Sequence, residues 1–185
     1  KIIVPAYTAI EIVDGDTFKT SEKQIIRVDG IDAPEIDRCG GPEAKQKLTD
    51  LITNKPLYLK IIFRDPFQRL VSEVYSPNGS IAKQMLASGN AMYSSKQGSD
   101  EVLKKLNNNA KENKLGIHSS KCTQAINPDI PKCNIKGNIN IENGTKLYRS
   151  KSCGQYDLTT IELYKGDRWF CSEKDAIKAG FTISQ

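Results

Sequence analysis

The amino-acid sequence predicts an α+β protein: a five-stranded Greek-key barrel with three helices, followed by a small module that a disulfide bond stabilises. Three observations lead to this expectation. Five short segments are rich in Val, Ile and Leu, as strands are. Three other segments carry apolar residues at helical spacing. After about residue 119 this pattern fades into Ser, Thr, Asn and Pro, and a second unit opens at Cys133.

The strands come first in the chain. Residues 2–13 are β-branched and aromatic-rich, and Asp14-Gly15 is typical of a hairpin turn. The turn-like stretch 64–68 separates two later candidates. The five expected strands are residues 2–13, 17–20, 24–28, 57–63 and 70–75.

Three helices are expected between and after these strands. The first covers residues 42–53, because Pro42 can open it and its apolar residues recur every three to four positions. Ser80 can cap the second, which Gly89 ends. The third should begin at Ser99 and end at Gly116. Strands and helices in this order fit a small barrel of the oligonucleotide-binding type better than a parallel α/β sheet.

Composition limits the class of protein. No apolar run approaches the roughly 20 residues of a membrane-spanning helix. The net charge of +5 is spread almost evenly along the chain, so charge alone does not argue for nucleic-acid binding. Five cysteines without a C-x-x-C pair favour disulfides outside the cytosol. Because the chain begins at Lys1, we expect a signal peptidase, or truncation of the expressed chain, to have removed a leader, and we expect a secreted or cell-envelope protein.

Two carboxylates at the ends of neighbouring strands are the first candidate site. Asp16 lies at the exit of the expected hairpin, and Asp32 ends the strand that follows. Each motif alone has an ordinary explanation, because Asp14-Gly15 is most often a turn and Arg27 alone is usually a surface cation. Together the carboxylates could share one cation. Oxygen donors select calcium or magnesium, and a flexible loop with backbone carbonyls favours calcium.

Three blocks of the sequence resemble the signature motifs of the staphylococcal nuclease (thermonuclease) family. They are residues 13–18 (VDGDTF), 27–35 (RVDGIDAPE) and 65–70 (DPFQRL), in the family's order and spacing. The resemblance runs from about Tyr7 to Ser119. It implies that Asp16, Asp32 and the main-chain carbonyl of Ala33 bind Ca²⁺.

The resemblance also implies the catalytic residues. Glu35 would position or deprotonate the attacking water, while Arg27 and Arg69 would hold the phosphate. A carboxylate is a weak base toward water, so this chemistry needs a metal and a stabilised transition state, and guanidinium groups stabilise phosphoryl oxygens. The implied activity is calcium-dependent hydrolysis of DNA, with RNA as a further candidate substrate, by direct in-line attack of water and with little sequence specificity.

Two segments depart from the family pattern. The family usually has Gly before the second arginine and often after it, whereas this chain has Gln68 and Leu70. Many members carry two tyrosines that line the nucleotide pocket, but here Tyr93 is followed by Ser94. Tyr93 is therefore the one candidate for nucleotide binding. His118, the single histidine, is expected to be structural.

The region after the first domain is expected to contain a linker, residues 121–132, and a module, residues 133–185; the first domain covers residues 1–120. The module resembles the sunset domain, with the matching stretches CNIKGNI and GDRWFCSEKDA. Ser172 and Asp175 form a capping-box pattern for its helix, which Gly180 would end. A unit of this size needs a cross-link, for which Cys133 and Cys171 are the first choice, with zinc binding by Cys133, Cys153 and Cys171 as the alternative.

Of the other cysteines, Cys39 and Cys122 are the expected second pair, which leaves Cys153 free. The module could retain substrate, attach the protein to a cell envelope or stabilise it. Two rival functions remain: a nucleic-acid binding module without catalysis, and a structural or adhesive envelope protein. The filled catalytic positions argue against the first rival. We expect a monomer.

Overall fold

A computed structural model describes residues 7–94, 98–141 and 143–184. The chain divides into two compact units, Lys1–His118 and Ser119–Gln185. The division differs from the expected linker at 121–132, because residues in that segment take part in the structure of the second unit.

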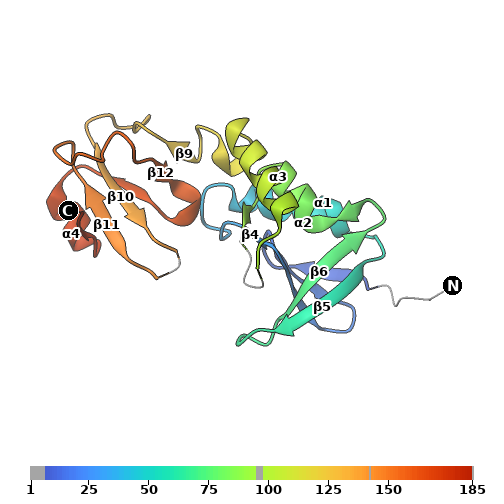
Figure 1. Cartoon of the computed structure of the whole chain (residues 1–185). Coiled ribbons are helices and arrows are strands. Elements are labelled where there is room, and N and C mark those ends of the chain that lie inside the picture. Colours follow the sequence, from blue (N-terminus) through green and yellow to red (C-terminus); the bar gives the residue numbers. More distant parts are fainter. Residues whose placement is uncertain (1–6, 95–97, 142, 185) are drawn as a thin grey trace. The chain divides into compact units, whose positions relative to one another are not determined.

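The first unit is built on a six-stranded sheet in the order β1-β2-β3-β6-β5, with β7 paired to β6 (Figure 1). All pairings are antiparallel except that between β3 and β6, which is parallel. An isolated antiparallel bridge joins Tyr7, before β1, to Leu57, before β5, so the two edges of the sheet approach each other there. The strands are β1 (Ala9–Ile12), β2 (Thr17–Thr20), β3 (Ile25–Val28), β5 (Tyr58–Arg64), β6 (Leu70–Ser76) and β7 (Gly79–Ser80).

Strands occur at all five predicted positions. Within 2–13 the described part forms a strand only over Ala9–Ile12, and residues 2–6 lie outside the described residues. Two short strands, β4 (Ile31–Asp32) and β8 (Met92–Tyr93), pair with each other and were not predicted. Two residues are too few to show an alternating pattern. Closure into a five-stranded barrel stays a prediction.

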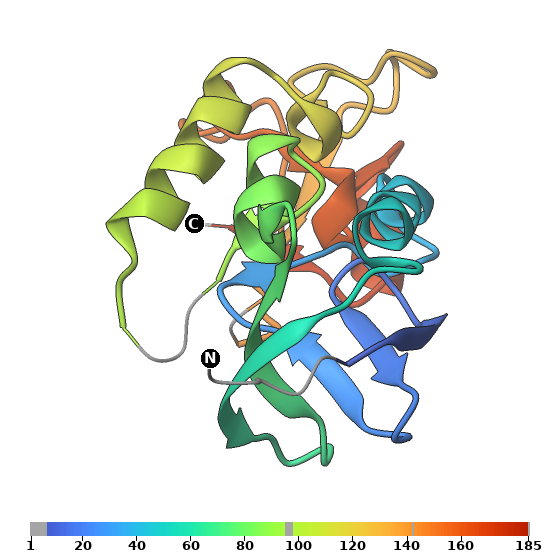
Figure 2. The same ribbon diagram turned by 90° about the vertical axis from the view of Figure 1, so that its right-hand side faces the viewer.

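Three helices lie together on one side of the sheet (Figures 1 and 2). They are α1 (Gly41–Ile52), α2 (Ile81–Ala87) and α3 (Glu101–Glu112). Ser80 caps α2 as predicted, by accepting a hydrogen bond from the Lys83 amide. Asp100 rather than Ser99 caps α3, because the Asp100 carboxylate accepts two amide hydrogen bonds and also suits the positive end of the helix dipole.

One apolar core joins the helices to the sheet. Leu48 and Ile52 of α1, and Met85 and Leu86 of α2, are fully buried against strand residues such as Phe18. Leu48 and Ile52 lie four positions apart on α1. Met85 and Leu86 likewise lie four positions after two other buried residues of α2, Ile81 and Ala82, as one apolar helix face requires. The core thus fixes the helices against the sheet that carries the candidate site.

The second unit contains a four-stranded sheet in the order β13-β10-β11-β14 and a two-stranded pair, β9 with β12. Its strands are β9 (Thr123–Gln124), β10 (Ile135–Ile139), β11 (Lys146–Arg149), β12 (Ile161–Glu162), β13 (Arg168–Phe170) and β14 (Thr182–Ile183), and its helix is α4 (Glu173–Lys178). Ser172 caps α4 through the Asp175 amide, as predicted. Phe170 and Phe181 pack edge to face with ring centres 5.0 Å apart.

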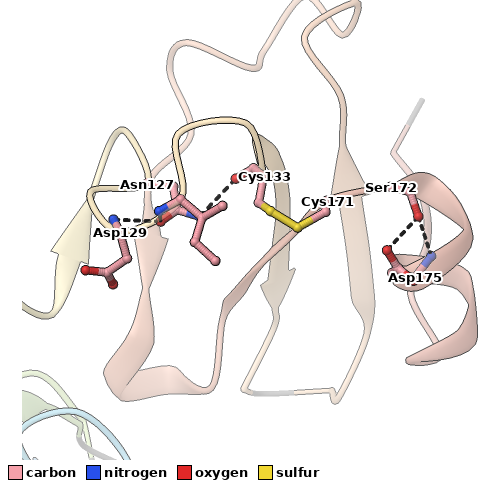
Figure 3. The surroundings of a disulfide bond; sticks show 7 residues. Asn127, Asp129, Cys133, Cys171, Ser172 and Asp175 are labelled. Atoms are coloured by element: carbon pink, nitrogen blue, oxygen red, sulfur yellow. Dashed lines mark hydrogen bonds between the residues drawn. A yellow bond between two sulfur atoms is a disulfide. The ribbon is translucent and has the colours of Figure 1, made fainter.

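Residues of the expected linker belong to this second unit. Thr123–Gln124 pairs with Ile161–Glu162, and the Trp169 indole donates a hydrogen bond to the Gln124 side chain at 2.7 Å. The Asn127 side-chain amide donates to the Cys133 carbonyl (Figure 3). The polar composition of residues 121–132 predicted a flexible linker, but polar side chains of this segment form hydrogen bonds within the second unit.

Four of the five cysteines are disulfide-bonded and the fifth is free, as expected, although Cys39 and Cys122 belong to different units. Cys133 and Cys171 form the predicted disulfide bond (Figure 3). Cys39 and Cys122 are both disulfide-bonded, and Cys153 carries a free thiol. The alternative zinc site is wrong, because two of its three proposed ligands are bonded to each other. Within the described ranges, no helix is long and apolar enough to cross a membrane.

Candidate active site

The turn between β1 and β2 fixes the first site residue, Asp16. The Asp14 carboxylate accepts a hydrogen bond from the Asp16 amide at 3.0 Å. Asp16 in turn accepts hydrogen bonds from the Thr17 hydroxyl and the Ala33 amide, both at 2.8 Å. Gly15 makes this approach possible, because a Cβ atom there would lie 2.6 Å from the Cβ atoms of both Ala33 and Ala44. Asp16 is therefore held firmly between the hairpin and the loop after β4.

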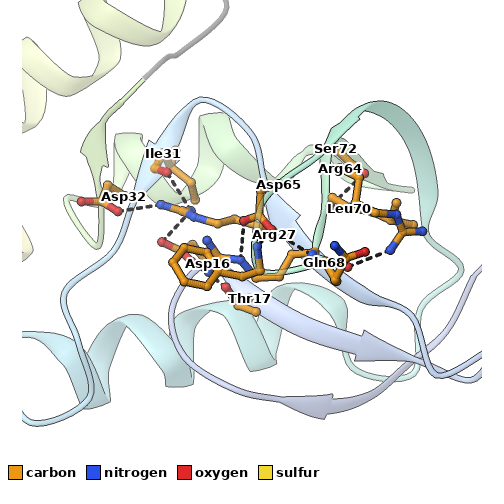
Figure 4. A network of polar contacts seen from close by, with 12 residues as sticks. Asp16, Thr17, Arg27, Ile31, Asp32, Arg64, Asp65, Gln68, Leu70 and Ser72 are labelled. Atoms are coloured by element: carbon orange, nitrogen blue, oxygen red, sulfur yellow. Dashed lines mark hydrogen bonds and ion pairs between the residues drawn. The ribbon is translucent and has the colours of Figure 1, made fainter.

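Arg27, in the middle of β3, joins two carboxylates (Figure 4). Its Nη1 lies 2.8 Å from Asp16 Oδ2, and its Nη2 lies 2.6 Å from Asp32 Oδ1. Nη1 also donates to the Ile31 carbonyl at 3.1 Å. The side chains of Asp16 and Arg27 are 7% and 18% exposed, so their ion pair is shielded from water. The two carboxylates predicted from the sequence thus converge on one cation.

Burial changes the acidity of Asp16. Desolvation raises its pKa to about 6; the charge of Arg27 opposes this shift and that of Asp14 adds to it, while the hydrogen bonds from Ala33 and Thr17 also oppose it. The carboxylate is thus costly to bury unless a cation neutralises it. A cation beside Asp16 favours its ionised form.

Arg69 is anchored by Asp65 in the turn between β5 and β6. Arg69 Nε donates to Asp65 Oδ2 at 2.7 Å, and Asp65 Oδ1 accepts the amide hydrogens of Phe67 and Arg69. Burial alone would raise the pKa of Asp65, but the hydrogen bonds and charge of Arg69 outweigh it and lower this pKa. Gln68 takes a left-handed conformation, with φ of 66°, at the position where the family usually has Gly.

The register of the sheet brings the two arginines together. Arg27 is paired with Val71 of β6, and Arg69 comes directly before the first residue of β6, two positions before Val71. Both arginines line one pocket, which the parallel β3–β6 pair and the end of β8 surround. Its other lining residues are Val28, Asp29, Gly30, Ile31, Phe63, Asp65, Val71 and Ser94.

Glu35 lies on the loop that follows Asp32 and Ala33. Its side chain is exposed, and within the described residues its carboxylate makes no hydrogen bond or ion pair. Its main-chain carbonyl is close-packed against α1, because a Cβ atom at Gly41 would lie 2.0 Å from this oxygen. The loop backbone is thus fixed while the carboxylate faces solvent. Glu35 does not line the pocket that contains Arg27 and Arg69.

Tyr93 does not line the pocket that contains Arg27 and Arg69. Its hydroxyl accepts a hydrogen bond from the Asp100 amide at 2.9 Å and donates to the Gly98 carbonyl at 3.3 Å. Tyr93 thus anchors the start of α3, and its proposed nucleotide contact stays a prediction. Ser94 lines the pocket instead. Buried His118 lies in the short helix Gly116–His118.

Sequence reasoning missed three supporting residues. Asp65 could have been found, because an Asp four residues before Arg69 in a turn is well placed to accept its amide hydrogen. Thr17 follows Asp16 directly, and Ser94 follows Tyr93, but their orientation depends on strand pairing. Across the described part of the chain, no three His, Cys, Asp or Glu side chains gather as a group that could hold a metal ion.

Comparison with known proteins decides the family. The model of the family described as staphylococcal nuclease homologue matches residues 25–120, just over half of the chain. The chain belongs to this family. The matched region of this staphylococcal nuclease homologue contains Arg27, Asp32, Glu35 and Arg69. Asp16 lies before it, so its place in the site rests on the geometry above.

Similar proteins carry nuclease names. An uncharacterized endonuclease of Escherichia coli is 32% identical over 114 residues, which cover 60% of this staphylococcal nuclease homologue and 74% of the E. coli protein. An uncharacterized endonuclease of Haemophilus influenzae is 29% identical over 112 residues, which cover 58% of this chain and 63% of the relative. The probable staphylococcal-like nuclease CAN4 of rice (Oryza sativa subsp. japonica) is 37% identical over 73 residues, 40% of this chain and 15% of the rice protein.

Proposed function

We propose that this protein is a calcium-dependent nuclease that hydrolyses the phosphodiester bonds of DNA, and that RNA is a second substrate. The observation that carries the proposal is the convergence of Asp16 and Asp32 on Arg27, beside a pocket that Arg69 also lines. The nuclease names of its relatives support the same reaction class. A site that holds backbone phosphate has little basis for choosing a base sequence, so we expect low sequence specificity.

The acidic residues fit a hard cation. Asp16 Oδ2 and Asp32 Oδ1 already share one positive group at 2.8 and 2.6 Å. Asp16, Asp32 and the Ala33 carbonyl would offer only oxygen, which suits Ca²⁺. When bound, Ca²⁺ would polarise a phosphoryl oxygen and lower the pKa of a coordinated water. The Arg27 guanidinium, which now holds both carboxylates, would then have donors to offer to a substrate phosphate.

The protein's own side chains supply the remaining chemistry. Arg27 and Arg69 present planar donors to phosphoryl oxygens, where negative charge develops in the transition state. Asp65 holds Arg69 in place, so little entropy is lost when Arg69 binds phosphate. Glu35 is free to orient a water molecule or accept its proton. Direct attack by that water needs no covalent intermediate.

The test is hydrolysis of single-stranded DNA by the full chain, first with calcium and then with excess chelator. Wild-type protein should cut only with calcium. Asp16→Ala and Asp32→Ala should each abolish cutting while circular dichroism shows a folded chain. Asp50→Ala is the matched control, since Asp50 is exposed on α1 and its side chain accepts a hydrogen bond from Gln46, away from the pocket of the site. Cutting at the wild-type rate by either site variant would refute the assignment, and DNA binding without cutting by the wild-type would support the rival binding module.

We also propose that the protein works as a monomer outside the cytosol, secreted or attached to the cell envelope. Disulfide-bonded cysteines support this location, because reducing cytosol keeps thiols free. Fractionation of the producing cells and light scattering of the purified chain test the two statements. Recovery in the cytosolic fraction with all thiols reduced would contradict the first, and a dimer mass would contradict the second.

A further inference from the structure

The hairpin of β10 and β11 in the second unit (Figure 1) carries two cationic residues at directly paired positions. Lys136 on β10 lies opposite Arg149 on β11. Like charges at opposite positions of antiparallel strands are destabilising. The arrangement therefore favours an anion near this face of the hairpin.

The ammonium group of Lys136 is bound inside the second unit. Its Nζ donates to the carbonyls of Tyr156 at 2.9 Å and Thr159 at 2.6 Å, and it lies 4.1 Å from the centre of the Tyr156 ring. These contacts hold the segment after β11 against the sheet. Lys136 is 1% exposed and cannot reach a ligand. Its positive charge remains beside Arg149.

The guanidinium of Arg149 has few hydrogen-bond partners among the described residues. Its Nη1 makes one long hydrogen bond, 3.4 Å, to Asn138 Oδ1, and its Nε is buried without a hydrogen-bond partner. In the described ranges no carboxylate forms an ion pair with it. A guanidinium has five N–H donors, and leaving buried donors unmet is costly. Arg149 is therefore ready to bind an anion.

Arg149 is also one of the residues that line a surface cavity. Polar groups of Asn138, Asn140, Thr145 and Lys165 line it with Arg149, and Ile139, Ile141 and Leu147 supply apolar walls. Lys165 is paired with Glu162 at 2.5 Å, so its charge is balanced nearby. Among the residues that the structure describes, the cavity thus offers one cation without a paired carboxylate, together with neutral hydrogen-bonding groups and apolar surface.

We propose that this cavity binds a phosphodiester group of nucleic acid, with Arg149 as its principal contact. One free guanidinium matches the single charge of a phosphodiester, which it can bind through two parallel hydrogen bonds. The apolar walls suit the sugar that accompanies the phosphate. The choice of nucleic acid rests on the proposed function, under which the second unit retains the substrate.

Fluorescence anisotropy of a labelled oligothymidylate tests the proposal with the full chain in excess chelator, so that binding is measured without hydrolysis. Arg149→Gln should weaken binding about tenfold, as expected for the loss of one charge-assisted contact. It should also reduce the slope of log affinity against log salt by about 0.7, the value for one phosphate contact on a single strand. The matched control is Arg168→Gln, because Arg168 is exposed on β13 and does not line the cavity.

Equal affinities of wild-type and Arg149→Gln, or equal losses in both variants, would overturn the proposal. So would displacement of the oligonucleotide by polyglutamate at the same charge concentration, since a carboxylate polymer would then bind as well. If Arg149→Gln fails to fold, the wild-type decides: its Arg149 Nε–H resonance must shift on addition of oligothymidylate. A protein that cuts no DNA but loses affinity through Arg149→Gln would refute the proposed nuclease and support this site.

Discussion

At the scale of single residues, the site depends on how two arginines and four carboxylates are partnered. Arg27 is shared by Asp16 and Asp32, Arg69 is bound by Asp65, and the Glu35 carboxylate faces solvent. Arg149 in the second unit has no such carboxylate among the described residues. The sequence predicted that Asp16 and Asp32 lie close together, from their places at strand ends, but not that Arg27 forms ion pairs with both of them. The anchoring of Arg69 was not, because it depends on the turn conformation at Gln68.

Glu35→Gln should retain calcium binding and lose about 10² to 10⁴ in the rate of DNA cleavage, the usual contribution of a general base. Calorimetric titration with calcium and single-turnover cleavage measure the two effects. Glu112→Gln, a change of an exposed residue at the end of α3, is the control. Unchanged turnover in Glu35→Gln would remove Glu35 from the mechanism.

Asp65→Asn should act through Arg69. The amide cannot form the same ion pair with Arg69 Nε, so substrate binding and turnover should fall about tenfold or more while Asp65→Glu recovers part of the loss.

The lowered pKa of Asp65 also makes the stability of the protein depend on pH. The ionised carboxylate stabilises the fold at neutral pH, and this contribution is lost as pH falls below about 4 through the folded pKa. The free energy of unfolding, measured in urea, should therefore fall less steeply with decreasing pH in Asp65→Asn than in the wild-type protein. If neither this pH dependence nor the cleavage kinetics change, Arg69 does not depend on its ion pair with Asp65.

At the scale of elements, close packing around small residues sets the position of the site. α1 was predicted almost to the residue because Ala44, Leu48, Leu51 and Ile52 repeat at helical spacing. β4 and β8 escaped prediction because a two-residue strand exists only through its partner. The contact of Gly15 with Ala33 and Ala44 likewise joins segments distant in sequence, so no local pattern could show it.

Gly15→Ala should lower the free energy of unfolding by about 1 to 3 kcal/mol, because the added methyl group would meet the Cβ atoms of Ala33 and Ala44 at 2.6 Å. Urea unfolding followed by far-ultraviolet circular dichroism measures this change. Gly154→Ala is the control, since a Cβ atom there meets nothing within 4 Å. If both variants unfold at the same urea concentration, the packing at Gly15 is not tight.

At the scale of the whole molecule, two compact units with different means of stabilisation form one chain. The first has a large apolar core, and the second a small one built on Ile135, Tyr148, Phe170, Ala176 and Phe181. The sequence predicted both units and the Cys133–Cys171 bond, because a segment of about 50 residues rarely holds together by burial alone. It placed the boundary too late, because the pairing of Thr123–Gln124 with Ile161–Glu162 joins residues far apart in the chain.

Removing the Cys133–Cys171 bond should unfold the second unit before the first. A bond that joins residues 38 apart stabilises by about 2 to 4 kcal/mol, mainly by restricting the unfolded chain. The single tryptophan, Trp169, lies in the second unit and reports its unfolding by fluorescence. In the Cys133→Ser, Cys171→Ser double variant, the fluorescence midpoint should fall by several degrees, while DNA cleavage by the first unit persists to the wild-type temperature. Cys153→Ser, which removes the free thiol, should change neither signal. A double variant with the wild-type fluorescence midpoint would show that the small core suffices by itself.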